Sequence, residues 1–142
     1  NYGMAFGKFS LSPPYVGAIV FFNHANNSTS SSPGYVSLRD KSANGYYVNS
    51  VTSGLNDNIP RHYVFQRRQV SFGVWKLEIY INGALNAEVT LPVVVDLNST
   101  EPVQLFSRTD ASQVVRGTYD RLTYRVGAAL TPAEVLGHFT NP

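Results

Sequence analysis

Apolar and polar side chains alternate with a period of two through most of this chain, a pattern typical of β-strands with one buried face. Residues 35–40 and 46–51 show this alternation, and a tight turn at Asn44-Gly45 is expected to join them as a hairpin. The continuous apolar run at residues 15–22 predicts a central strand that is buried on both faces. Polar loops are expected at residues 23–34 and 52–60.

Residues 61–92 predict a meander of three antiparallel strands. The first strand reverses at residues 71–73, and Asn82-Gly83 joins the second strand to the third, because a type I′ turn requires positive φ at both central positions. Alternation places the apolar side chains of the second and third strands on one face: Trp75, Leu77, Ile79, Ile81, Leu85, Ala87, Val89 and Leu91. The opposite, polar face is expected to carry Lys76, Glu78 and Tyr80.

Two more strands are expected near residues 103–107 and 117–126, followed by one helix. Thr131-Pro132-Ala133-Glu134 combines a capping Thr, a Pro at the first helical position and the Glu of a capping box. The side chains expected to dock this helix on the sheets are Val135, Leu136 and Phe139. Together these elements predict an all-β, antiparallel β-sandwich with one short C-terminal helix.

The length and composition fit a single domain over residues 1–142. Hydrophobic residues make up 43% of the chain and charged residues only 14%, which argues against disorder and against a coiled coil. The chain has no Cys, so disulfides and thiolate chemistry are excluded. A net charge of +2 without a basic stripe predicts no nucleic-acid partner. No apolar stretch reaches the roughly 18 residues of a membrane span, so no membrane insertion is expected.

Three Asn-x-Ser/Thr sequons, at Asn26, Asn27 and Asn98, lie in polar stretches that are expected to form loops. Such sites are compatible with secretion, and we therefore expect an extracellular or surface-displayed protein. Because the sequence opens on Asn1 and not on Met, a processed product or a fragment of a larger chain or assembly is expected.

Two segments of the C-terminal 80 or so residues carry a family resemblance. Residues 75–85, WKLEIYINGAL, resemble the "kLYvNGvl" hairpin of the laminin-G-like, concanavalin A-like jelly roll found in lectins, glucanases and adhesive modules. His62-Tyr63-Val64-Phe65 is similar to the "hHvav" strand that pairs with that hairpin. Residues 116–122, RGTYDRL, and the later ALTPAEV resemble the family's "fxGxIDdvriY" strand and its closing "raLSxaEI" helix.

The resemblance implies a jelly-roll β-sandwich over the whole chain. The N-terminal 60 residues match only in texture, so the opening strand of the family is expected to be short or missing. One residue more than usual separates Asp120 from Leu130, which predicts a bulge in the last strand. Asp120 matches the Asp of the family's "GxIDd" motif and is interpreted as an acceptor for backbone donors.

The family includes β-glucan hydrolases, which place acidic residues alternately on one strand so that two carboxyl groups lie close together. No two acids of this chain have that spacing within a strand. Glu78 and Glu88 are expected to be near-diagonal neighbours across the Asn82-Gly83 hairpin, and the preferred interpretation is two outward-facing acids. The histidines are scattered, at His24, His62 and His138, and no Gly-x-Ser-x-Gly motif is present. The chain is therefore predicted not to be an enzyme.

Binding features are more plausible than catalytic ones. Proteins bind sugars with flat aromatic rings surrounded by polar side chains, and the candidate ligand residues are Tyr46, Tyr47, Asn56, Asp57 and Arg67. The two tyrosines point to opposite faces of a strand, so one of them is expected to be exposed. A solvated hairpin edge is the alternative interpretation of that pair. Trp75 shares parity with the apolar face and is assigned to the core, with a ligand platform as the alternative.

Arg61, Arg67 and Arg68 are candidates for a cationic patch. Laminin-G-like domains often bind sulfated glycans through such patches, so the resemblance favours an anionic-glycan site at these arginines. The alternative is charge placed against edge-to-edge aggregation. No cofactor is required, but the family recurrently holds a structural calcium ion, for which Asp40, Asp57 and Asp110 are the candidate ligands.

The function predicted from these residues is a non-catalytic, lectin-like carbohydrate-binding or cell-adhesion module of an extracellular or surface protein, with a glycan or a surface protein as partner. The alternative is a structural or assembly domain, such as a coat, filament or adhesin domain, that binds another protein. Val93-Val94-Val95 could be its exposed edge or one more buried strand. A glycoside hydrolase is the third and least favoured alternative.

Overall fold

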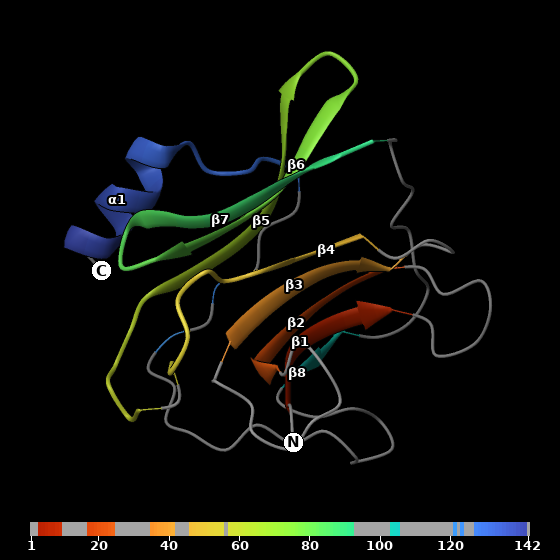
Figure 1. Cartoon of the computed structure of the whole chain (residues 1–142). Coiled ribbons are helices and arrows are strands. Elements are labelled where there is room, and N and C mark those ends of the chain that lie inside the picture. Colours follow the sequence, from red (N-terminus) through yellow and green to blue (C-terminus); the bar gives the residue numbers. More distant parts are fainter. Residues whose placement is uncertain are drawn as a thin grey trace.

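A computed structural model of the chain describes residues 3–9, 17–24, 35–41, 46–55, 57–92, 103–105, 121, 123 and 127–141. These residues form an all-β, antiparallel fold with one short helix, as the alternation predicts (Figure 1). The strands are β1 Gly3–Phe9, β2 Gly17–His24, β3 Tyr35–Lys41, β4 Tyr46–Asn49, β5 Tyr63–Ser71, β6 Val74–Ile81, β7 Ala84–Leu91 and β8 Gln104–Leu105, and the helix is α1 Pro132–Thr140.

Five strands form one sheet in the order β4-β3-β2-β1-β8. The apolar run expected to form a central strand lies largely in β2, which pairs with β1 on one side and β3 on the other. The expectation of a short or missing opening strand is wrong, because β1 spans seven residues and pairs with both β2 and β8. Gly3 and Gly7 lie within β1, and glycine weakens the β-propensity by which a strand is recognised.

The other sheet has the order β5-β6-β7 and is the predicted meander. Asn82 and Gly83 have φ values of 51° and 80°, as a type I′ turn requires. The side chain of Asn82 also extends the pairing, because its Oδ1 accepts the backbone N–H of His62 at 3.0 Å. The turn between β5 and β6 lies at Phe72 and Gly73, and Gly73 has a φ of 72°.

A bulge in β7 changes which side chains of the hairpin share a face. Ile79 pairs with Ala87 but Tyr80 pairs with Leu85, so Asn86 is the extra residue. The prediction that Leu85 joins the buried apolar face is therefore wrong, and Leu85 is 49% exposed. Asn86 holds the segment after β4, since its Oδ1 accepts the N–H of Val51 at 3.0 Å.

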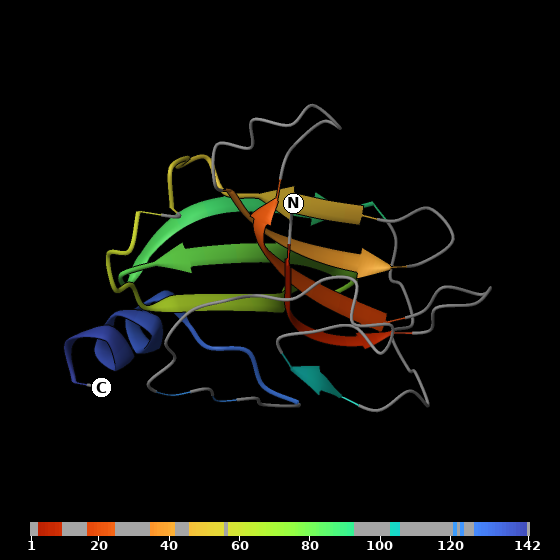
Figure 2. The ribbon, with the colours of Figure 1, turned by 90° about the horizontal axis from the view of Figure 1, so that it is seen from below.

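The hydrophobic core draws on both sheets. Its buried residues are Val20, Val48, Leu77, Ile79 and Leu91, from β2, β4, β6 and β7. Figures 1 and 2 show the two sheets lying against each other, with α1 beside the start of β7. The odd-numbered side chains of β6 thus face the other sheet, as the alternation predicts.

Helix α1 begins as its sequence predicts. Thr131 is the N-cap, and its hydroxyl accepts the backbone N–H of Glu134 while the Glu134 carboxylate accepts the N–H of Thr131. Val135 is fully buried, whereas Leu136 and Phe139 are about half exposed. Both of these partly exposed side chains lie over Gly83, so α1 packs on the Asn82-Gly83 turn.

Several predicted features lie outside the described residues: Asn56, Asp110, Asp120, the Asn44-Gly45 turn, the valines at 93–95, the three sequons and most of the strand at 117–126. In the described part of that last segment, Arg121 and Thr123 are both exposed. No helix among the described residues has the length and apolar character needed to cross a bilayer.

Candidate functional site

Arg67 and Trp75 form a stacked pair at one end of the three-stranded sheet. Both side chains lie on the face directed toward the core, Arg67 from β5 and Trp75 from β6. The guanidinium carbon of Arg67 lies 4.7 Å from the centroid of the indole ring, within the range of a cation–π interaction. The assignment of Trp75 to the core is confirmed, because its side chain packs against the buried cluster. The indole ring is only half buried, and Arg67 covers part of it.

A half-open pocket of about 340 Å³ lies beside this pair. It is bounded by the stem of the β5–β6 hairpin and by the segment that leads into α1. Its lining residues are Arg67, Arg68, Gln69, Trp75, Gly127, Ala129 and Thr131. We call it the Arg67–Trp75 pocket. The lining thus includes two arginines, a glutamine, a threonine and a tryptophan, which are residue types suited to a polar or anionic ligand.

Gln66 holds the second wall of the Arg67–Trp75 pocket in place. Its side-chain Nε2 donates to the carbonyl of Leu130 at 3.0 Å, and its Oε1 accepts the N–H of Leu130 at 3.0 Å. The amide thereby pairs with the backbone as a neighbouring strand would. This double hydrogen bond fixes the position of Ala129 and Thr131 relative to the β5–β6 stem.

Glu78 lies at the centre of a buried polar cluster on the opposite face of the same strands. The Nε of Arg68 donates to Oε2 of Glu78 at 3.0 Å, and Nε2 of Gln66 donates to the same oxygen at 2.7 Å. The hydroxyl of Tyr80 lies 3.3 Å from that oxygen. Glu78 has 0% exposure. The prediction that it faces outward is therefore wrong, because the C-terminal segment covers this part of the polar face.

The ionisation of this cluster follows from its contacts. Burial opposes the charged form of Glu78, but hydrogen bonds from Arg68 and Gln66 outweigh burial and lower the pKa of the carboxyl group. The hydrogen bond to Glu78 in turn raises the pKa of Arg68, and burial raises the pKa of Tyr80. A general acid of a glycosidase needs a raised pKa, so the surroundings of Glu78 favour a structural ion pair.

Glu88 lies directly opposite Glu78 on the neighbouring strand. The prediction of a diagonal relationship is wrong, because the bulge at Asn86 shifts the register by one residue. Glu88 is exposed at the surface and forms an ion pair with Lys76. Each of the two acids is thus paired with a cation on a neighbouring strand: Glu78 with Arg68 of β5, and Glu88 with Lys76 of β6.

The arginines of the expected cationic patch have separate partners. Arg61 forms a bidentate ion pair with Asp57, with Nη1–Oδ1 and Nη2–Oδ2 distances of 2.6 and 2.7 Å. The hydrogen bond from Arg61 holds the pKa of Asp57 well below its usual range. Arg68 pairs with Glu78, as described above. Only Arg67 and Arg68 line the pocket, so the structure brings together two of the three arginines.

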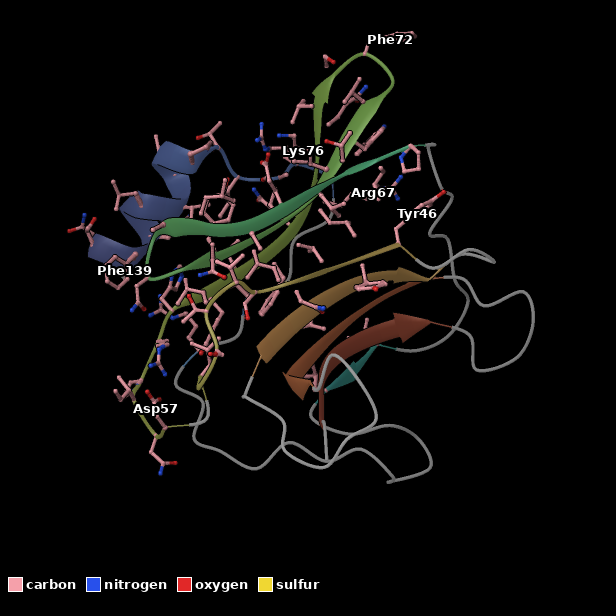
Figure 3. All side chains as sticks on the ribbon, viewed as in Figure 1. Tyr46, Asp57, Arg67, Phe72, Lys76 and Phe139 are labelled. Carbon is pink, nitrogen blue, oxygen red and sulfur yellow. The ribbon has the colours of Figure 1, made fainter. Side chains whose placement is uncertain are left out.

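The tyrosines of β4 point in opposite directions, as predicted. Tyr47 is 53% exposed, whereas Tyr46 packs against the hydrophobic core. Figure 3 shows Tyr46 and Arg67 at the same end of the molecule, while Asp57 lies at the far end. Of the candidate ligand residues that the structure describes, Arg67 alone lines the pocket.

Of the three candidate calcium ligands, Asp110 lies outside the described residues. Asp40 lies on β3 opposite Tyr46, and both carboxylate oxygens of Asp57 accept from Arg61. Within the described ranges, no group of three or more His, Cys, Asp or Glu side chains has the arrangement of a metal site. A calcium site at these residues remains a prediction.

Comparison with known proteins gave no match to a family model, to a curated protein or to a solved structure. The function is therefore argued from the site alone.

Sequence reasoning missed the Glu78 cluster and the Arg67–Trp75 pocket. Gln66 lies opposite Glu78 because a bulge at Val70 shifts the register of β5 against β6 by one residue. Counting back from the turn at Phe72-Gly73 alone would place Arg67 there, so the sequence carried no usable signal for the cluster. The pocket left no signal either, since its second wall comes from residues about 60 positions further along the chain.

Proposed function

We propose that this protein is a non-catalytic carbohydrate-binding module with a laminin-G-like jelly-roll sandwich, and that the Arg67–Trp75 pocket is its binding site. The observation that carries the proposal is the stacking of Arg67 on Trp75 at the wall of a half-open pocket. The two antiparallel sheets with a shared core and a C-terminal helix support the jelly-roll assignment.

The chemistry of the pocket favours an acidic sugar. A guanidinium group carries five N–H donors in one plane, and stacking on the indole ring restricts the orientation of that plane. Carboxylate and sulfate groups accept two such donors at once. Gln69 supplies an exposed amide, which suits the hydroxyl groups of a sugar ring. A uronic acid or a sulfated sugar is therefore the proposed ligand class.

Positioning of Arg67 by the indole ring lowers the cost of binding. A long, flexible side chain loses rotamer freedom when it is immobilised on a ligand. Arg67 already rests against Trp75, and Arg68 is held by Glu78. Both guanidinium groups are thus restrained before a ligand arrives, and the polar network behind Arg68 has a role in shaping the site.

The experiment that tests this proposal is a screen of immobilised acidic and neutral glycans, followed by titration calorimetry of any glycan bound. Loss of one charge-assisted hydrogen bond costs about 1.5–3 kcal/mol, so Arg67→Ala is expected to weaken binding by about tenfold to 150-fold. Arg61→Ala is the matched control, because Arg61 pairs with Asp57 in the loop before β5 and does not line the pocket. Equal affinity of the Arg67→Ala variant and the wild type would contradict the proposal.

An extracellular or surface-displayed location is part of the proposal. Its support is the pairing of a glycan-type site with the sequons at Asn26, Asn27 and Asn98. Expression in a secreting eukaryotic cell, followed by enzymatic deglycosylation, tests whether these sites accept glycans. A mass unchanged by deglycosylation would remove this support.

A further inference from the structure

The end of the β5–β6 hairpin extends beyond the third strand of its sheet. The last residue of β7, Leu91, pairs with Trp75, so residues 70–74 have no β7 residue opposite them. Figure 1 shows this end of the hairpin projecting away from α1 and from the five-stranded sheet. In the described part of the chain, the projecting end is a two-stranded ribbon with nothing paired to either edge.

The projecting end carries three exposed apolar side chains, Val70, Phe72 and Val74, which we call the hairpin tip. Phe72 is 100% exposed and the two valines are 37% exposed. Figure 3 places Phe72 at the outermost point of the hairpin. The turn itself does not require an aromatic residue there, because Gly73 takes the positive φ. A group of exposed apolar side chains on a projecting element marks a contact surface.

The stem of the same hairpin offers an acceptor for such a side chain. The lining of the Arg67–Trp75 pocket includes three residues of the edge strand β5, and Trp75 and Ala129 give it apolar walls. A guanidinium group such as that of Arg67 also attracts the face of an aromatic ring. We propose that two copies of this chain associate by exchanging hairpin tips, so that Phe72 of each copy occupies the Arg67–Trp75 pocket of the other.

A two-fold arrangement allows Phe72 of each copy to enter the Arg67–Trp75 pocket of the other at the same time. Phe72 lies in the turn, and Trp75 follows that turn by two residues of β6, which is roughly 7 Å along the hairpin. Two hairpins that lie antiparallel and overlap by this length place each Phe72 at the level of the other copy's Trp75. Such a contact is isologous, so it closes at two copies and does not extend into a filament.

The size of the contact predicts a transient dimer. A single aromatic side chain buries roughly 150–250 Å², and two partly exposed valines add less than that. Each copy thus contributes well under the roughly 800 Å² per partner of a standard interface. Dissociation is therefore expected in the upper micromolar to millimolar range.

An anionic membrane is the other surface that an apolar tip with cations at its base would suit. Here, however, two of the basic residues at the base are compensated: Arg68 pairs with Glu78 and Lys76 pairs with Glu88. Membrane attraction by basic side chains depends on their uncompensated charge. The second copy is favoured because its pocket is present on the same chain.

Sedimentation velocity over increasing protein concentration, up to about 1 mM, tests the dimer. The wild type is expected to approach the mass of two copies, while Phe72→Ala stays monomeric at the same concentration. Ile59→Ala is the matched control, because Ile59 is also exposed but lies in the loop before β5. This variant is expected to associate like the wild type. A wild type that stays monomeric throughout, or a Phe72→Ala variant that still dimerises, would overturn the proposal.

Trp75 provides a second readout, because it is the only tryptophan of the chain. Its fluorescence is expected to change with protein concentration in the wild type and to be constant in Phe72→Ala. Dimerisation without any change at Trp75 would place the contact elsewhere and overturn the exchange. Binding of a wild-type monomer to phosphatidylserine vesicles that requires Phe72 would assign the tip to membranes instead. Phe72 and an acidic glycan would occupy the same pocket, so an excess of glycan is expected to shift the wild type toward the monomer, whereas Phe72→Ala is expected to retain its affinity for acidic glycans.

Discussion

Arg68 and Glu78 form an ion pair beneath the C-terminal segment, on the sheet face that the alternation of the sequence assigns to solvent. The carboxylate is fully buried while the guanidinium is only partly so. Removing one member of such a pair leaves the other without a counter-charge, which is more costly than removing both. This relationship links the stability of the sheet to the shape of the Arg67–Trp75 pocket, because Arg68 belongs to both.

Arg68→Ala is expected to lower the free energy of unfolding by about 3 kcal/mol, because Glu78 would remain buried without its cation. Urea denaturation monitored by circular dichroism measures the change. The double variant Arg68→Met with Glu78→Leu is expected to recover most of this loss. Lys76→Ala is the control on the same hairpin, and it is expected to cost less than about 1 kcal/mol because its pair with Glu88 is exposed. Equal losses of unfolding free energy in Arg68→Ala and Lys76→Ala would show that burial of Glu78 does not increase the cost of removing its cation.

Gly83 and Gly73 give a matched test of how α1 packs. Both have positive φ, so an alanine at either position is strained. A Cβ at Gly83 would meet Cδ1 of Leu136 at 3.0 Å and Cβ of Phe139 at 3.2 Å, whereas a Cβ at Gly73 would meet nothing within 4 Å. We expect Gly83→Ala to destabilise the protein by about 1–3 kcal/mol more than Gly73→Ala, as overpacking does. Thermal or urea unfolding measures the difference, and equal destabilisation would argue that α1 does not rest on the turn.

Protonation of His62 is expected to weaken the packing of α1. Burial and the nearby His138 lower the pKa of His62 below its usual value of 6.5. The ring of His62 also lies against Phe139 of α1, with centroids 6.1 Å apart. The unfolded chain therefore takes up a proton more readily than the folded one, so this contribution to stability is complete above pH 6.5 and declines as the pH falls below it.

Urea midpoints between pH 5 and pH 8 test this dependence. The wild type is expected to lose stability below pH 6.5, and His62→Gln is expected to show a flatter profile in that window. An identical slope in the two proteins would assign the pH dependence to other groups. Asp57 and Glu78, whose pKa values are both lowered in the folded protein, are expected to contribute losses only at more acidic pH.

Gln66→Leu is expected to release the wall of the pocket from the sheet. The substitution removes both hydrogen bonds between Gln66 and the backbone of Leu130. Hydrogen exchange of the Leu130 amide is expected to accelerate by about tenfold or more, since one hydrogen bond contributes about 0.5–1.5 kcal/mol and two are lost. The amide of Ile79, in the centre of β6, serves as the internal reference. Unchanged exchange at Leu130 would contradict the role of Gln66.

Local sequence was sufficient to predict three features: alternation predicts the meander, the Asn82-Gly83 pair predicts the turn, and the capping residues at 131–134 predict the start of the helix. Trp75, Leu77 and Ile79 face the core because residues two apart on a strand share one face of the sheet. Strand β1 was missed because its two glycines weaken the local signal, and its position depends on pairing with β2 and β8. The bulge at Asn86 was missed because nothing in the alternation marks an inserted residue.

The site was predicted in part. Arg67 was selected for its charge, but its stacking on Trp75 depends on the diagonal placement of the two residues across β5 and β6. The burial of Glu78 could not be inferred from its own strand, since Gln66 holds the segment at Leu130, from a distant part of the chain, over that face. Contacts of this kind are set by tertiary packing, which a single sequence does not display.

The central claim is that the Arg67–Trp75 pocket binds an acidic carbohydrate. Its most direct test is a nuclear magnetic resonance titration that follows the indole N–H of Trp75, the only tryptophan of the chain, during addition of a uronic-acid-containing or sulfated oligosaccharide. The account predicts a saturable shift of this resonance in the wild type and in Arg61→Ala, and its loss in Arg67→Ala. A resonance that does not move with any acidic oligosaccharide, or that moves equally in Arg67→Ala, would contradict it.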